Sequence, residues 1–376
     1  MPPFASITLI ALIFFVVIPG IGAFAVRRRW RRFRTRIGEA ALFPLLTYRT
    51  ARGIAADAQE AGSFRFFGSL ESIQHDRALS LRGEDLTVAA DMTNSVIYVM
   101  PRDTGDLPDE SPLRTTWNRL GSLTEGTRVF VAGRLVRHGP QVTIGGDAAT
   151  PLLVVLYDGP ERDLLRRSIW SGRQINEYWN QLTPGALAGG TLALIILAYV
   201  LLRSSAGRLP AVAALAVASI PLLPLLPPGV VTFFMYRRSW KRGRILRAHR
   251  DVLLLPLRHI HPDGTGSLPD GEAYSVLSCD QREAMRYVAE GAYLPDPPTK
   301  LTSREYSVFG SPSADGVTVP ADPMTELTVI PGDPTELSLR CQKLARRFEI
   351  LSILILGGGL LANVAIAFLT LQYLVR

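Results

Sequence analysis

FASITLIALIFFVVIPGIGAFAVRRRWRRFRTR, residues 4–36, joins an apolar block directly to a run of arginines. A helix that spans a bilayer needs about 20 mainly apolar residues, and flanking arginines stay on the cytoplasmic side. Ala23-Phe24-Ala25 has the small-x-small form of a signal-peptide cleavage site. The block has no side-chain cation before it, however, and the arginine run after it resists translocation. We therefore expect residues 1–36 to be an uncleaved transmembrane anchor with an Arg-rich flank.

Three further blocks, residues 184–202, 209–236 and 350–375, contain no Asp, Glu, Lys, Arg or His. The composition, 47% hydrophobic and 20% charged, also argues against a wholly soluble chain. The sequence predicts an α+β integral membrane protein with four transmembrane helices and two small cytoplasmic domains. The four prolines of the third block, between 221 and 228, predict a helix over 209–222, then a break and a short continuation. The short link at 203–208 makes residues 184–236 a transmembrane hairpin.

Cations gather after the first and third apolar blocks and before the fourth, and the net charge of the chain is +8. The representative positions are Arg27, Arg28, Arg29, Arg237, Arg238, Arg346 and Arg347. All four blocks then agree on one topology in a bacterial inner membrane, with both termini outside and both polar segments in the cytoplasm. Binding of nucleic acid is the alternative explanation for such arginine runs. Their position at the ends of the blocks favours a topology function with contact to anionic headgroups, and no nucleic-acid partner is expected.

Residues 37–160 read as a β-rich domain. Short β-rich stretches separated by turn residues cover 63–71, 86–90, 95–99, 127–136, 141–144 and 152–156. Such a series predicts a small closed barrel or a sandwich, and the Gly126-Thr127-x-Val129-x-Val131-x-Gly133 spacing is common in OB-like barrels. Residues 101–116 are expected to form a long exposed loop.

Residues 161–183 repeat apolar side chains at helical spacing, with arginines on much of the other surface. Trp170 and Trp179 are residue types expected at a headgroup boundary. We predict an amphipathic interfacial helix that leads into the second span. The alternative is an ordinary domain helix that packs on the barrel.

Residues 237–333 are predicted to form a second small α+β domain. Asp280 and Glu283 have capping-box spacing, and Gly291 can end the helix that they begin. Stretches 304–309, 316–319 and 326–330 have strand composition. Asp333-Pro334-Thr335-Glu336 is a strong helix start, so residues 334–376 are expected to form one long helix that includes the fourth span.

The order of these parts resembles the bacterial GIDE group of membrane-anchored domain proteins over residues 1–202. The similarity is carried by Phe67-Gly68-Ser69-Leu70-Glu71, by the Gly-x-x-Val-x-Val-x-Gly strand and by Pro151-Leu152-Leu153-Val154-Val155. In the eukaryotic relatives, ubiquitin-ligase activity belongs to a terminal zinc-binding RING. Only Cys279 and Cys341 are present here, so the resemblance does not imply that activity.

The sequence offers few candidate catalytic or metal-binding residues. His259 and His261 would place two rings on one face of a strand and are the candidate metal ligands, with Asp263 nearby. A calcium loop beginning at Asp263 lacks the acidic twelfth residue of an EF-hand, since Tyr274 lies there. Nucleotide-binding and hydrolase motifs are missing from the sequence, no cofactor is expected, and the catalytic residues, if any, are unknown.

The fourth block carries a candidate helix-packing face of Gly357, Gly358, Gly359 and Asn363, which could meet Gly189-Gly190 or another protein. Ion-coupled transport normally needs ionisable groups within the spans, and these blocks have none. The leading hypothesis is a non-enzymatic inner-membrane scaffold or accessory protein that acts with a protein partner or a second copy of itself. The alternatives are a membrane-bound enzyme using His259, His261 and Asp263, and an accessory subunit of a transport complex.

Overall fold

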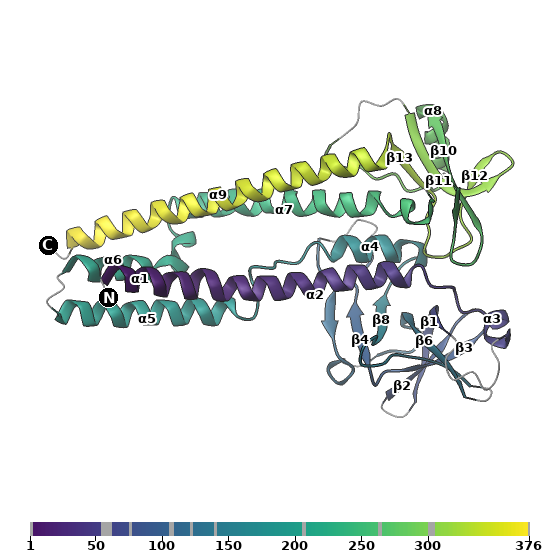
Figure 1. The fold of residues 1–376 in the computed structure, drawn as a ribbon, viewed down its shortest axis with the longest axis horizontal. Helices are drawn as coiled ribbons and strands as arrows, with labels where there is room; N and C mark the ends of the chain where they lie inside the picture. Colours follow the sequence, from purple (N-terminus) through teal and green to yellow (C-terminus); the bar gives the residue numbers. More distant parts are fainter. Residues whose placement is uncertain are drawn as a thin grey trace. The chain divides into compact units, whose positions relative to one another are not determined.

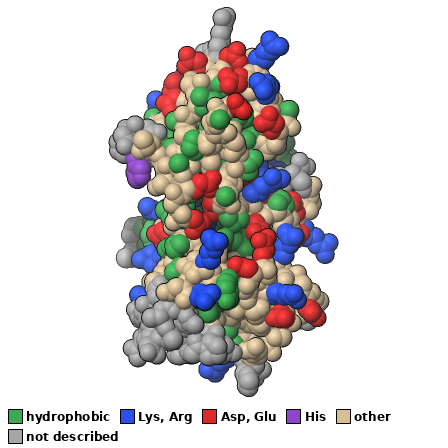
Figure 2. All heavy atoms as spheres, turned by 90° about the vertical axis from the view of Figure 1, so that its right-hand side faces the viewer, with side chains coloured by type: hydrophobic (Ala, Val, Ile, Leu, Met, Phe, Trp, Pro, Cys, Tyr) green, Lys and Arg blue, Asp and Glu red, His purple; other side chains and the backbone are tan. Residues whose placement is uncertain are grey.

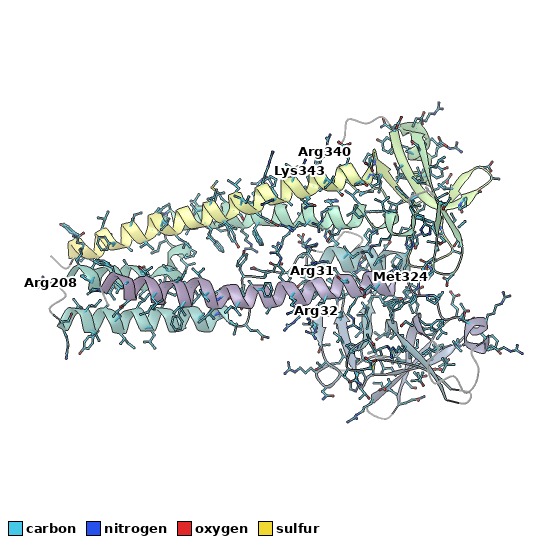
Figure 3. All side chains as sticks on the ribbon, viewed as in Figure 1. Arg31, Arg32, Arg208, Met324, Arg340 and Lys343 are labelled. Carbon is cyan, nitrogen blue, oxygen red and sulfur yellow. The ribbon has the colours of Figure 1, made fainter. Side chains whose placement is uncertain are left out.

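The computed structural model describes most of the chain, in two compact units (Figure 1). The described residues are 3–53, 62–74, 77–104, 109–120, 123–138, 141–204, 208–261, 265–299 and 305–374. We call Met1–Arg31, Asn176–Ile245 and Lys343–Arg376 the helical unit, and Arg32–Ile175 with Leu246–Gln342 the mixed unit. Three helices, α2, α7 and α9, contribute residues to both units. Figure 3 labels Arg31 and Arg32, the neighbouring residues of α2 at which one unit ends and the other begins.

Within the described residues of the helical unit there are three helices long and apolar enough to cross a membrane. The first runs over Pro3–Ala40 as α1 (Pro3–Ala11), η1 (Leu12–Val17) and α2 (Ile18–Ala40). The others are α5 (Thr183–Arg203) and α9 (Pro334–Leu374). Most of their apolar side chains face outward, as is expected where the surrounding solvent is lipid.

The third apolar block is not one spanning helix. It divides into α6 (Arg208–Ala218), η5 (Ile220–Leu225) and the start of α7 (Gly229–Leu253). Proline has no N–H to donate and its ring clashes with the preceding turn, so the four prolines interrupt the helix where the break was predicted. The described residues thus contain three helices of membrane-spanning length, and the third of the four predicted spans is a broken segment.

Five strands of the mixed unit close a ring. They are β1 (Ser63–Gln74), β2 (Ala78–Arg82), β3 (Thr87–Asp91), β6 (Arg128–His138) and β7 (Gln141–Gly145). β1 pairs with both β2 and β6, β2 pairs with β3, and β6 pairs with β7, all antiparallel. The parallel pairing of β3 with β7 completes the ring. Alternate side chains fill its interior, among them Leu81, Val88, Val131 and Ile144, and all of these are fully buried.

Three more strands extend the sheet from β6. β8 (Leu152–Tyr157) pairs with β6, β4 (Ser95–Val99) pairs parallel with β8, and β5 (Leu113–Thr115) forms the edge. Every residue of β8 is buried, which matches its continuously apolar sequence. Each of the predicted strands is present, but β2 was missed, and the predicted loop at 101–116 contains β5.

The predicted helix over 161–183 is shorter than expected. η4 (Glu161–Asp163) leads into α4 (Leu164–Ser171), and the chain from Gly172 to Leu182 is irregular. Arg34 donates to the Gly172 carbonyl at 2.6 Å, so this carbonyl is satisfied without a further helical turn. Nearly all of α4 is buried, including Trp170, which is the arrangement of an ordinary packed domain helix.

The second module of the mixed unit is a small sheet with one helix. β11 (Glu305–Ser313) pairs with β10 (Ala273–Asp280), β12 (Gly316–Thr318) and β13 (Thr328–Pro331), and β9 (Thr265–Ser267) lies beyond β10. α8 (Gln281–Ala289) begins at Asp280, whose carboxylate accepts from the Glu283 N–H at 2.8 Å, and Gly291 follows its end with φ +97°. η6 (Pro256–His259) connects α7 to the module.

Figure 2 shows acidic and basic side chains mixed over one outer face, as on a water-exposed domain.

The long C-terminal helix is confirmed, since α9 runs from Pro334 to Leu374. The Asp333 carboxylate accepts from the Thr335 N–H at 2.9 Å and the Glu336 N–H at 3.3 Å. These bonds satisfy two of the four backbone donors that a helix start leaves open.

Candidate functional site

A buried ion pair joins the closed five-stranded ring, which we call the barrel, to the second module within the mixed unit. Arg65 lies on β1, and its side chain is fully buried against Asp322, with which it forms a short hydrogen-bonded ion pair. Asp322 also accepts from the Thr325 hydroxyl at 2.5 Å, and Asp270 lies 3.8 Å from the same guanidinium. A buried charge is tolerated only when it is paired, so this contact fixes the two modules together.

A cavity of about 40 Å³ lies beside this ion pair, between α4 and the second module. Its polar lining is supplied by Arg162, Arg166, His259, Tyr274, Tyr293, Thr325, Glu326 and Thr328. Leu165, Val252, Leu255, Pro256 and Met324 supply the apolar wall. Figure 3 labels Met324 on the segment of the second module that precedes β13. Since one water needs about 10–15 Å³ of such space, the cavity has room for roughly three waters or for a ligand of a few atoms.

Glu326 and Arg166 face each other in this cavity. The Arg166 Nε lies 3.3 Å from the Glu326 Oε1, but the atoms are poorly aligned, and neither has a hydrogen-bond partner among the described residues. Arg166 is held by the Asp163 carboxylate at 2.9 Å and by the Tyr293 ring, whose centre lies 3.9 Å from the guanidinium carbon. Both groups therefore retain bonding capacity toward the cavity.

Burial raises the pKa of Glu326 to about 8, and a hydrogen bond to Asp163 together with the negative charge of Asp163 acts in the same direction. The guanidinium groups of Arg166 and Arg162 oppose this shift, but burial outweighs them. At neutral pH the Glu326 carboxyl is thus mostly protonated and can donate a hydrogen bond.

Tyr274 and His259 close another side of the cavity. The Tyr274 side chain is 2% exposed, and its hydroxyl is buried with no hydrogen-bond partner in the described part of the chain. Its ring meets that of His259 edge-on, with 5.5 Å between the centroids. Burial lowers the pKa of His259, so this imidazole is neutral near pH 7.

The predicted histidine pair does not form one face. His259 ends η6 and is 8% exposed, whereas His261 is exposed and lies in the irregular chain before β9. Because the segment is not a strand, the alternation that would align the two rings is missing. Among the described residues, no group of three or more His, Cys, Asp or Glu side chains could hold a metal ion. Asp263 lies outside the described residues.

The predicted membrane-interface residues divide into two groups. All seven of the predicted arginines, which lie on the shared helices α2, α7 and α9, are exposed, and Trp179 is 65% exposed. Trp170 differs, since it is 6% exposed and packs edge-on against His249 in the mixed unit, with 4.8 Å between the ring centroids. Burial lowers the pKa of His249 to about 4, so this neighbour is neutral as well.

The predicted packing face on α9 is used only in part. A Cβ added at Gly359 would meet the Thr232 side chain, whereas Gly357 and Gly358 have open space around the same position. Gly189 and Gly190 instead accommodate Phe14 and Phe15, so the first of the two predicted contacts is not formed, and packing against another protein stays a prediction. Asn363 does pack inward, and its Nδ2 donates to the Leu226 carbonyl at 3.1 Å.

Comparisons with protein-family models, with curated proteins and with solved structures found no match to this chain. The site therefore has to be judged from its own geometry. Sequence reasoning missed Arg65, Asp322, Tyr274 and Glu326 as site residues. One usable indication was present, because Arg65 is a charged residue inside the otherwise apolar Phe64–Phe67 stretch of a predicted strand.

Proposed function

We propose that this protein is a non-enzymatic scaffold of the bacterial inner membrane, which presents two cytoplasmic modules at the membrane surface as one body. The observation that carries the proposal is the buried Arg65–Asp322 pair, which joins the two modules although they are separated in the sequence by the transmembrane hairpin. A partner can bind reproducibly across both modules only if the distance and the orientation between the modules are fixed. The three membrane-length helices supply the anchoring.

The scaffold proposal predicts a partner that depends on the joined modules. In-cell cross-linking followed by purification of the full-length protein in mild detergent should retain a stoichiometric protein partner or a second copy. Asp322→Ala separates the modules and should reduce this retention at least fivefold, whereas the exposed control Glu290→Gln should retain the partner fully. Purification of the wild-type protein alone, over several cross-linkers and detergents, would contradict the proposal.

The proposed topology makes a second prediction. Single cysteines introduced at Glu125 or Asp315, both at exposed turns of the mixed unit, should stay unlabelled by a membrane-impermeant maleimide in intact cells. A cysteine at Ser204, beyond the end of α5, should be labelled. The native Cys279 and Cys341 are buried, so the unmodified protein provides a low background. Labelling at Glu125 without lysis would exclude the cytoplasmic placement.

We also propose that α6, η5 and the start of α7 cross the bilayer together as a broken fourth span. Irregular backbone is tolerated at membrane depth only where neighbouring groups satisfy the freed carbonyls. Thr191 donates to the Ala218 carbonyl at 3.1 Å, and Asn363 donates to the Leu226 carbonyl, so the break receives donors from α5 and from α9.

Removing these donors should destabilise the helical unit. Thr191→Val and Asn363→Leu should each lower the free energy of unfolding of the detergent-solubilised protein by about 1 kcal/mol. The first removes the side-chain donor to the Ala218 carbonyl, and the second removes one of two donors to the Leu226 carbonyl, which also accepts from the Val230 N–H. Thr8→Val is the matched control, since the Thr8 hydroxyl bonds only to the Phe4 carbonyl of its own helix turn and is exposed. Equal stability of Asn363→Leu and the control would remove the argument that the break lies in lipid.

A further inference from the structure

We propose that the cavity between α4 and the second module is a binding site for a small monocarboxylate of the size of acetate. The site is independent of the scaffold proposal, because it concerns a small ligand and not a protein partner. Tyr274 is the residue that points to a ligand, since its hydroxyl is buried and unpartnered among the described residues. A buried polar group of this kind normally has a partner.

The charge of the lining favours a monoanion. Arg162 and Arg166 carry two positive charges, and Asp163, which is bonded to Arg166, carries one negative charge. Asp322 is neutralised by Arg65. With Glu326 protonated and His259 neutral, the lining keeps one uncompensated positive charge.

The hydrogen-bonding inventory favours an acceptor ligand. The Tyr274 hydroxyl and the Arg166 Nε are both able to donate, and neither has a hydrogen-bond partner within the described chain. A carboxylate has two oxygens, each with two acceptor positions, and charged hydrogen bonds to Arg are the stronger kind. The apolar wall that includes Leu165 and Met324 suits the methyl group of acetate better than a fully polar anion. The volume limits the ligand to about four heavy atoms.

Ionisation of Glu326 should oppose binding. The groups that face it are Arg162, Asp163 and Arg166 from η4 and α4, Tyr274 from β10, and Tyr293. Loss of its proton adds a negative charge to the lining and strengthens the attraction of Glu326 to Arg166. Acetate affinity should therefore fall about tenfold between pH 6.5 and pH 9, in proportion to the protonated fraction.

The experiment is a titration of the full-length protein in detergent with ¹³C-labelled acetate, followed by NMR. At pH 6.5 the wild-type protein should show saturable binding, Tyr274→Phe should bind at least fivefold more weakly, and the exposed control Tyr48→Phe should match the wild type. Glu326→Gln keeps this side chain uncharged at both pH values, so the variant should bind acetate at pH 6.5 and lose no affinity at pH 9. This variant tests the site even if Tyr274→Phe fails to fold.

Two results would overturn the inference. One is the absence of saturation by acetate up to 100 mM at pH 6.5, in which case the cavity is filled by water alone. The other is tighter binding of bicarbonate or chloride than of acetate, which would show that the apolar wall does not select a monocarboxylate.

Discussion

Asp322→Ala is expected to destabilise the mixed unit by about 3–5 kcal/mol, because it leaves the guanidinium of Arg65 buried without its partner. Arg65 is fully buried, and its Nε and Nη1 already have no hydrogen-bond partner among the described residues. These atoms therefore offer no existing hydrogen bond that could offset the one lost with Asp322. Native-state hydrogen exchange of the full-length protein in detergent, read at the amides of β1 and β13, measures the opening free energy directly.

The double variant Arg65→Met, Asp322→Leu separates the cost of an unpaired charge from the loss of the contact. Replacing both partners by apolar groups removes the buried charge, so the double variant should recover most of the stability that Asp322→Ala loses. Asp270 is 39% exposed and lies 3.8 Å from Arg65, so Asp270→Ala should cost about 1 kcal/mol or less. If Asp322→Ala and Asp270→Ala have equal effects, the buried pair is not the main link between the modules.

The second large expected effect is on the pH dependence of the free energy of unfolding. The folded pKa of Glu326 is about 8, above its ordinary value of 4.5, so between these pH values the folded protein holds a proton that the unfolded chain has released. The free energy of unfolding must then fall as pH rises from about 5 to 8, by an amount of the order of 3 kcal/mol. The contribution is fully present below pH 4.5 and is lost above pH 8.

Glu326→Gln should abolish this slope, since the amide does not titrate. At pH 8 the variant should therefore be more stable than the wild-type protein, a result opposite to that of most substitutions of buried residues. Thermal unfolding of both proteins between pH 5 and pH 9 measures the slope, and Glu290→Gln, an exposed position, should follow the wild type. Parallel pH profiles for Glu326→Gln and the wild type would show that Glu326 is not protonated in the folded state.

The features that could be predicted from the sequence are those set by local interactions. The caps at Asp280 and Asp333 depend on residues two or three positions away, and both form as their spacing predicts. The break after Ala218 follows from proline chemistry alone. The strand composition of 63–71 and 127–136 likewise identified β1 and β6.

The candidate site could not be predicted in this way, because its contacts are long-range. Arg65 and Asp322 are separated by 257 positions, and nothing in the periodicity of either segment indicates the other. The pKa of Glu326 depends on burial beneath α4, which is a property of packing and not of sequence spacing. The helix predicted over 161–183 is an error of another kind, because there a local pattern predicted too long a helix. The helical repeat of apolar residues continues past Ser171 in the sequence, but in the structure the helix ends there and Arg34 donates to the Gly172 carbonyl.

The uninterrupted course of α9 has a mechanical consequence. At 1.5 Å per residue its 41 residues extend about 60 Å, twice the thickness of a hydrocarbon core, so in the proposed membrane placement roughly half of the rod projects beyond the lipid tails. No proline interrupts the rod after Pro334, and the consecutive glycines at 357–359 are its most compliant point, each costing about 1 kcal/mol of helix propensity relative to alanine. We therefore expect α9 to bend first at these three glycines when bilayer thickness changes and to stay straight between Pro334 and Leu356.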